Sequence, residues 1–176
     1  RDWSSDVCSS DLLPTLAGLL GKEPRKSWDG ESFAAAVSDG TPTGRDQLVV
    51  SQCCHGCQRS VRWGDWLYIR TYHDFFHLFP KEMLFNLAED PHEQHDLAAA
   101  RPDLCAEAAR RYLSWHDDMM FTQPEGYYHD PLWEVIHRGG PCHAHHRLKH
   151  YCERLEETGR GWAVPLLKER HPEEFR

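Results

Sequence analysis

Cysteine and histidine side chains gather in two short segments that lie far apart in the sequence. Cys54 and Cys57 form a C-x-x-C pair, and His143 and His146 form a histidine pair with the same spacing. Two thiolates and two imidazoles are a standard tetrahedral ligand set for zinc. One interpretation is therefore a non-catalytic zinc-binding or interaction module that uses these four residues. A thioredoxin-like redox role is less favoured, because no βαβ pattern surrounds the cysteines.

The segments that must position these side chains predict an α+β fold. Short β-branched or aromatic runs are separated by turns, and the Gly64-Asp65 pair between two of them is typical of a hairpin. Because the connections are short, the runs predict a four-stranded antiparallel meander and not βαβ units. Strands are expected at residues 47–52, 59–63, 66–72 and 83–87.

From Pro102 the apolar residues follow a helical period, so we expect a long helix that covers one face of the sheet. More helices are expected toward the C-terminus, the first capped by Asp130 with Pro131 in its first turn. Near the N-terminus, Asp11 is placed to cap a short helix that ends at Gly21. The expected helices are residues 12–21, 31–37, 102–120, 130–137, 147–158 and 162–169.

Composition excludes several classes of protein. The chain has 176 residues and a formal net charge of -8. This acidic excess argues against a nucleic-acid or anionic-membrane partner, since both need clustered positive charge. No apolar run approaches the roughly 20 residues that a bilayer span requires. The cysteine pattern differs from the disulfide framework of small secreted domains, so reduced thiols and a cytoplasmic location are favoured.

Residues 1–12 have neither helical nor strand periodicity. They resemble one reading-frame translation of a common short-read sequencing adapter. We therefore expect them to be an artefactual leader outside the fold, and the gene to begin upstream. Because an upstream segment could carry an export signal, the localisation stays open.

Three motifs resemble the C-terminal region of the sulfatases, in the alkaline-phosphatase-like superfamily. The stretch Val61-Arg-Trp-Gly-Asp-Trp-Leu-Tyr-Ile69 is similar to the family's (V/A)-R-x-G-x-(W/Y)-K-Y-I, and it departs at Leu67, where Lys is frequent. The segment Asp11-Leu-Leu-Pro-Thr-Leu16 resembles the family's D-(L/I)-x-P-T-(L/I). The third pattern is filled by Leu84-Phe85-Asn86-Leu87, Asp90-Pro91, Glu93 and Asp96-Leu97-Ala98.

The resemblance covers roughly residues 11–120, so residues 13–120 are expected to be the smaller C-terminal subdomain of a sulfatase. Residues 121–176 are expected to form a helical extension, of which 130–172 resemble an extension found in one bacterial subgroup. Within the subdomain, Asp90-Pro91 should fix a turn. We expect Glu93 and Asp96 to accept hydrogen bonds from nearby backbone groups and Leu97 to fill the core, which makes this motif structural and not catalytic.

The resemblance also implies a chemistry that this chain does not contain by itself. Sulfatases hydrolyse sulfate esters with an aldehyde hydrate made from Cys or Ser in C/S-x-P-S/A-R, beside a divalent cation that is usually calcium. The printed sequence has neither that motif nor an Asp-Asn/His-Gly ligand pair. We therefore expect calcium in the parent protein, no metal in this chain, and no activity from it alone. Its expected partner is the missing N-terminal catalytic domain of the same chain.

Loops of this subdomain rim the active-site cleft in the resembled family, which implies contacts with a sulfate-ester substrate. An arginine offers a planar fork to such an anion, and an imidazole can donate a proton near neutral pH. The alternative is that these are solvated loop residues without a ligand. The candidate substrate-binding residues are His55, Arg59, His73, His77, His143, His146 and Arg147.

Overall fold

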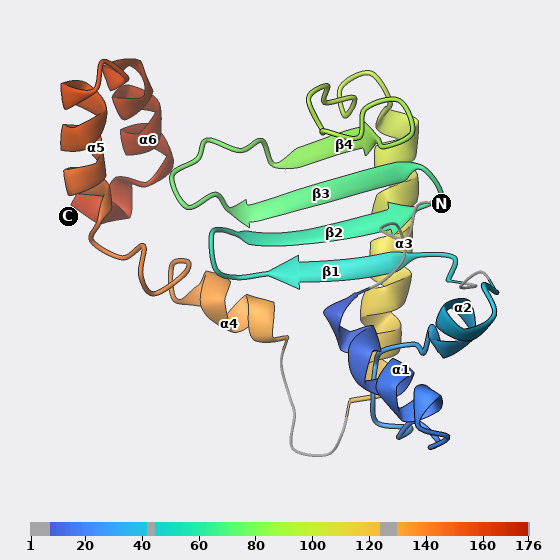
Figure 1. The fold of residues 1–176 in the computed structure, drawn as a ribbon. Coiled ribbons are helices and arrows are strands. Elements are labelled where there is room, and N and C mark those ends of the chain that lie inside the picture. Colours follow the sequence, from blue (N-terminus) through green and yellow to red (C-terminus); the bar gives the residue numbers. More distant parts are fainter. Residues whose placement is uncertain (1–7, 42–44, 124–129, 176) are drawn as a thin grey trace.

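A computed structural model describes residues 8–41, 45–123 and 130–175, and it confirms the α+β fold (Figure 1). A four-stranded sheet has the long helix α3 behind it, the small helices α1 and α2 beside one end, and α5 and α6 beyond the other end. The strands are β1 (Leu48–Gln52), β2 (Cys57–Trp63), β3 (Trp66–His73) and β4 (Glu82–Asn86). The helices are α1 (Leu12–Leu19), α2 (Ala34–Ser38), α3 (Pro102–Phe121), α4 (Pro131–His137), α5 (Leu148–Glu157) and α6 (Val164–Arg170), with short 3₁₀ turns at Ser9–Asp11, Gly161–Ala163 and Pro172–Phe175.

The sheet is the expected antiparallel meander, with the strands in the order β1-β2-β3-β4. Trp63 pairs with Trp66 across the two-residue turn that joins β2 to β3, and Gly64 in that turn has a φ of 49°. A φ in this region favours glycine because a Cβ atom would be strained there. The Gly-Asp signal thus placed the hairpin correctly.

The first hydrophobic core lies between the sheet and α3. Val61, Tyr68 and Leu84 occupy paired positions on neighbouring strands, so their side chains share one face. They pack with Cys105 and Ala108 of α3. The helical period in the sequence therefore identified the helix that covers the sheet.

The turn after β4 is held by carboxylates, although one expected contact is wrong. Asp96 accepts hydrogen bonds from the backbone N–H groups of Leu84 (3.0 Å) and Ala98 (2.9 Å), and Leu97 packs against the first core. Glu93 is exposed and its side chain makes no hydrogen bond within the described ranges. Asp90 takes that place, accepting from the backbone N–H of His95 at 2.7 Å.

Asp11 is buried and bonded, but it does not cap α1 as expected. Its carboxylate accepts hydrogen bonds from the backbone N–H groups of Cys8 and Glu31 and from Arg45, each at 2.7 Å. The side chain thus joins the start of α1 to a loop 20 residues later. Of the expected leader 1–12, residues 1–7 lie outside the described residues, whereas Asp11 is a structural centre of this corner.

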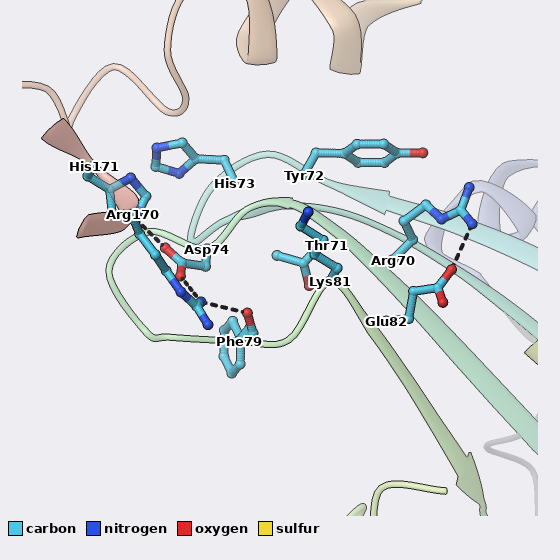
Figure 2. A pocket seen from close by; sticks show the side chains of 10 residues that line it. All are labelled: Arg70, Thr71, Tyr72, His73, Asp74, Phe79, Lys81, Glu82, Arg170 and His171. Atoms are coloured by element: carbon cyan, nitrogen blue, oxygen red, sulfur yellow. Dashed lines mark hydrogen bonds and ion pairs between the residues drawn. The ribbon is translucent and has the colours of Figure 1, made fainter. Parts of the chain in front are cut away.

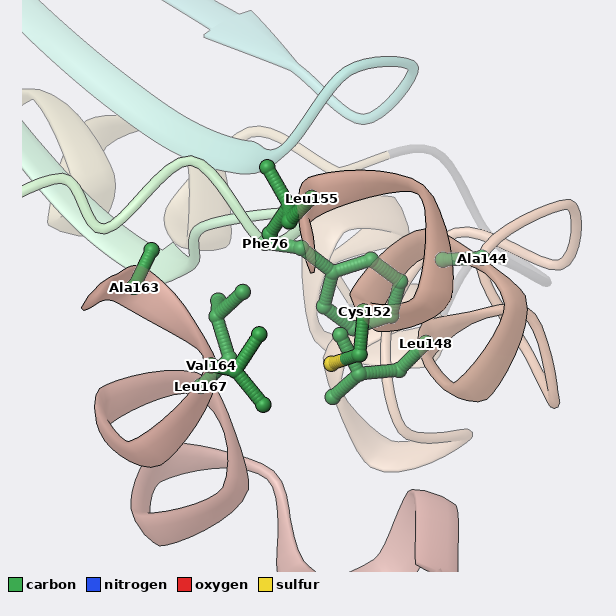
Figure 3. Close-up of a cluster of buried hydrophobic side chains, with 8 residues drawn as sticks. All are labelled: Phe76, Ala144, Leu148, Cys152, Leu155, Ala163, Val164 and Leu167. Carbon is green, nitrogen blue, oxygen red and sulfur yellow. The ribbon is translucent and has the colours of Figure 1, made fainter. Parts of the chain in front are cut away.

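The second hydrophobic core joins the C-terminal helices to the sheet, and the β3–β4 connection supplies its buried aromatic residue, with Phe75 and Leu78 packed against the cluster. Phe76, in the connection between β3 and β4, is 5% exposed and lies among side chains of α5, α6 and their flanking turns (Figure 3). Burying a phenylalanine contributes about 1.5–3 kcal/mol. The other members of this core are Ala144, Leu148, Cys152, Leu155, Ala163, Val164 and Leu167.

Within the described part of the chain, no helix is both long and apolar enough to cross a membrane.

Replacing Phe76 with alanine should destabilise the C-terminal helices, because it leaves a cavity in the second core. We expect a loss of about 3–5 kcal/mol in the free energy of unfolding, measured by urea denaturation. Phe121→Ala is the matched control, since Phe121 is 89% exposed and should change stability little. Equal midpoints for the two variants would show that Phe76 does not anchor these helices.

Candidate functional site

Three connections converge at the end of the sheet that faces α5 and α6 (Figure 1). They are the β1–β2 turn (residues 53–56), the β3–β4 connection (74–81) and the α4–α5 connection (138–147). Phe75 lies between the first and third, with its ring centroid 6.0 Å from that of His55 and 4.9 Å from that of His143. Segments nearly ninety residues apart therefore present imidazoles side by side.

Asp74 is the most heavily bonded group at this end (Figure 2). It is 5% exposed, and its carboxylate lies 2.8 Å from Nε2 of His171 and 2.8 Å from Nη1 of Arg170. Arg170 also donates to the backbone carbonyl of Phe79 at 2.9 Å. These contacts hold the end of α6 against the β3–β4 connection.

Burial and charge shift the pKa values of this pair in opposite directions. Burial alone would raise the pKa of Asp74, but hydrogen bonds from His171, Arg170 and the Phe76 amide lower it to about 2. Burial alone would lower the pKa of His171, but its hydrogen bond to Asp74 and the negative charge there raise it. The pair therefore favours the ionised carboxylate beside a protonated imidazole.

His73 has the opposite character. Burial, together with the positive charge of His171, lowers its pKa, so the neutral ring is favoured. Its Nδ1 accepts a hydrogen bond from the backbone N–H of Phe75 at 3.1 Å, which leaves the proton of the neutral ring on Nε2. Gly140 lies so close that an added Cβ atom would stand 2.6 Å from that Nε2, so this position requires glycine.

A cavity of about 660 Å³ opens beside these groups (Figure 2). Its lining contains three permanent cations against two carboxylates, and each carboxylate already contacts an arginine: Asp74 with Arg170, and Glu82 with Arg70 at 2.8 Å. The remaining cation is Lys81, whose ammonium forms no ion pair or hydrogen bond within the described ranges. The cavity is thus suited to an anionic group.

Arg59, a predicted substrate contact, is engaged by the protein itself. It is 5% exposed, and its guanidinium donates in a fork to Asp130 at 2.7 and 2.9 Å. It also donates to Ser51 (2.8 Å) and to Tyr112 (3.1 Å). Asp130 caps α4 through the backbone N–H of Leu132, as expected, so Arg59 fastens α4 to the sheet and to α3.

His55 and His143 approach each other, with ring centroids 6.2 Å apart. Cys54 joins them: one ligand atom from each of these three residues lies within 4.8 Å of the other two. This cluster only partly matches the four expected zinc ligands. Cys57 is fully buried in β2, where burial raises the pKa of its thiol to about 11. His146 is exposed with a φ of 59° and does not belong to the cluster.

The other predicted contacts lie apart from the cavity. His77 is exposed, and its ring approaches those of Phe75 and Phe79. Arg147 is exposed at the start of α5. His73 is the one predicted residue that lines the cavity. For His77, His146 and Arg147, substrate binding stays a prediction.

Sequence reasoning missed Lys81, Asp74, Arg170 and His171. No spacing could have revealed them, because Asp74 and His171 are 97 residues apart and meet only after α5 and α6 have packed on Phe76. The sole signal was the charge of Lys81 directly before a strand.

No protein-family model matches the chain. Solved structures do share its fold. One, the structure of BT4656 in complex with its substrate D-glucosamine-2-N,6-O-disulfate, aligns with a TM-score of 0.52 and 16% identity over 67% of this chain and 25% of that one. Another, Ps i-CgsB, aligns with a TM-score of 0.51 and 22% identity over 77% and 29% of the two chains. A candidate sulfatase from Bacteroides thetaiotaomicron gives a TM-score of 0.47 and 23% identity over 63% and 24%.

This chain therefore spans about a quarter of the length of the structures it matches. Two of the structures that match this chain are described as candidate sulfatases, from Bacteroides thetaiotaomicron and Bacteroides fragilis. The likeness establishes that the chain has the fold of one part of such proteins.

The Asp74–His171 pair should make stability depend on pH in a defined window. Because the pKa of His171 is raised in the folded state, its contribution to the free energy of unfolding is complete below about pH 6.5. That contribution is lost as pH rises through the pKa of His171 in the folded protein. The contribution of Asp74 is present above about pH 4 and is lost as pH falls toward 2. The difference in melting temperature between the wild type and His171→Gln should therefore shrink as pH rises from 6 to 9. His92→Gln is the control, since His92 is exposed and its ring forms no ion pair within the described ranges. A difference between wild type and His171→Gln that stays constant from pH 6 to 9 would contradict the expectation.

Arg59→Gln should cost about 3 kcal/mol in the free energy of unfolding, because it leaves Asp130 without its partner. This is the low end for breaking a buried pair, since the Asp130 side chain keeps 21% of its surface exposed. Arg62→Gln on the same strand is the control, because Arg62 has no ion pair among the described residues. Equal stability of the two variants would free Arg59 for a role in binding substrate.

Proposed function

We propose that this chain is part of a sulfuric ester hydrolase that acts on sulfated sugars, and that it contributes substrate contacts rather than reacting groups. The observation that carries the proposal is the shared fold with a protein whose structure is a complex with its substrate, a sulfated glucosamine. Three sequence motifs support the same class of enzyme. One forms the hairpin of β2 and β3, the second forms β4 and the turn after it, and the third forms the corner around Asp11. In the proposed parent, calcium and the nucleophile are supplied by residues outside this chain.

The cavity beside His73 is the place where we propose that the sulfate group binds. Lys81 offers an ammonium without a competing carboxylate, and the neutral His73 ring carries a proton on Nε2. Both groups donate to oxygen, and neither needs to change its protonation state to bind a sulfate. The paired arginines add positive potential at the walls.

The exposed leucines of α1 support contact with the rest of the parent protein. Leu12, Leu13, Leu16, Leu19 and Leu20 are between 46% and 75% exposed. Contiguous exposed apolar side chains of this kind are typical of a surface that another domain covers. We propose that the catalytic domain of the same parent chain packs there.

The class of reaction can be tested with a longer protein expressed from the upstream-extended reading frame. We expect that frame to contain C/S-x-P-S/A-R and its product to release sulfate from glucosamine sulfates, whereas the 176-residue chain alone should release none. A longer protein that carries the motif but releases no sulfate from sulfated sugars would overturn the proposal.

In that longer protein, Lys81→Met should raise KM for the sulfated sugar roughly 10–100-fold, the cost of one charged hydrogen bond, with little change in kcat. Lys149→Met on the exposed face of α5 is the matched control and should leave both constants unchanged. A Lys81→Met enzyme with unaltered KM would remove the cavity from the proposed binding site.

A further inference from the structure

The Cys54–His55–His143 cluster lies beside the proposed sulfate cavity but is chemically distinct from it. Its three ligand atoms lie within 4.8 Å of one another, on the β1–β2 turn and the α4–α5 connection. A tetrahedral zinc ion holds its nitrogen and sulfur ligands about 3.3–3.6 Å apart, as its bond lengths require. All three side chains are exposed, which leaves them room to rotate toward a common ion.

We propose that Cys54, His55 and His143 bind a zinc ion through the Cys54 thiolate and one ring nitrogen of each histidine, with a water molecule in the fourth position. A soft thiolate with two imidazoles favours zinc over calcium or magnesium, which take oxygen ligands. This site differs from the calcium expected in the parent protein, and it departs from the expectation that this chain binds no metal.

Phe75 supports the site because it limits where the two imidazoles can lie. Its ring meets the His143 ring at 4.9 Å and the His55 ring at 6.0 Å, so it forms a wall that both rings contact. The backbone of Phe75 is itself held, since its N–H donates to His73 and the next N–H donates to Asp74 at 2.9 Å. A preorganised wall lowers the entropic cost of bringing the ligands together.

The ion would add a direct link between the β1–β2 turn and the α4–α5 connection, beside the contacts that Phe76 and Asp74 already make with the C-terminal helices. The β1–β2 turn belongs to the sheet, whereas His143 immediately precedes Ala144, a member of the second core. Bound zinc should therefore stabilise the attachment of the C-terminal helices to the sheet, by mass action on the folded state. This inference does not rest on the proposed function, because it concerns metal binding by the 176-residue chain alone.

The test is a titration of the metal-free 176-residue chain with zinc chloride, in a non-thiol reductant, followed by calorimetry. We expect one equivalent to bind and the melting temperature to rise. Cys54→Ser and His143→Ala should each weaken binding at least about tenfold. The matched controls are Cys142→Ser and His146→Ala, exposed residues of the same connection, and neither should alter the affinity.

Cobalt gives a second measurement that does not depend on stability. Bound Co²⁺ should show the charge-transfer absorption of a cobalt–thiolate bond, and Cys54→Ser should abolish it. Less than one equivalent of zinc, or a wild-type charge-transfer band in Cys54→Ser, would overturn the proposal. Loss of binding in His146→Ala would also overturn it, in favour of a different ligand set.

Discussion

The arrangement at the functional end depends on the burial of one short connection, residues 74–76, between the sheet and the C-terminal helices. Asp74 binds His171 and Arg170 of the last helical segment, while Phe76 fills the core between α5 and α6. Because the polar anchor Asp74 and the apolar anchor Phe76 are two residues apart, they fix both the distance of α5 and α6 from the sheet and the rotation of these helices relative to it. Together with the Arg59–Asp130 pair, which fastens α4 to β2, these anchors hold the α4–α5 connection beside the β1–β2 turn.

The same anchor sets the electrostatics of the histidines around it. Burial lowers the pKa of neighbouring His73, and the positive charge of His171, which Asp74 favours, lowers it further. The pKa values of two imidazoles whose ring centroids are 5.1 Å apart are thereby shifted in opposite directions. Asp74 favours the cationic form of His171, and burial favours the neutral form of His73 at the wall of the cavity.

Arginine 59 shows how a residue suited to anion binding can be committed to structure. Its fork would fit a sulfate as well as a carboxylate, but Asp130 supplies the carboxylate from within the chain. The rings of Tyr112 and Trp115 lie 5.5 and 5.1 Å from the guanidinium carbon, so the positive charge is further stabilised by aromatic faces. The ion pair joins β2 to α4, and the hydrogen bond to Tyr112 adds α3, so the guanidinium has a structural role whether or not it also contacts a substrate.

The sequence by itself determined the elements and their order. The Gly64-Asp65 turn, the alternation along β2 and β3, and the apolar period of α3 are local patterns, and local backbone preferences made them readable. In the turn after β4, Asp96 makes the backbone contacts expected of it, whereas Asp90 and not Glu93 makes the other one.

Only the tertiary structure decided which chemical groups meet. The sequence offered two pairs for a metal, but strand β2 buries Cys57 and a turn directs His146 elsewhere, so Cys54 and His143 meet His55 instead. The sequence also offered seven candidate substrate contacts. One of them, His73, lines the cavity, together with Lys81, which no sequence pattern had indicated. The reason is physical: spacing along a chain fixes neighbours within a helix or strand, whereas contacts between loops depend on how the cores beneath them pack.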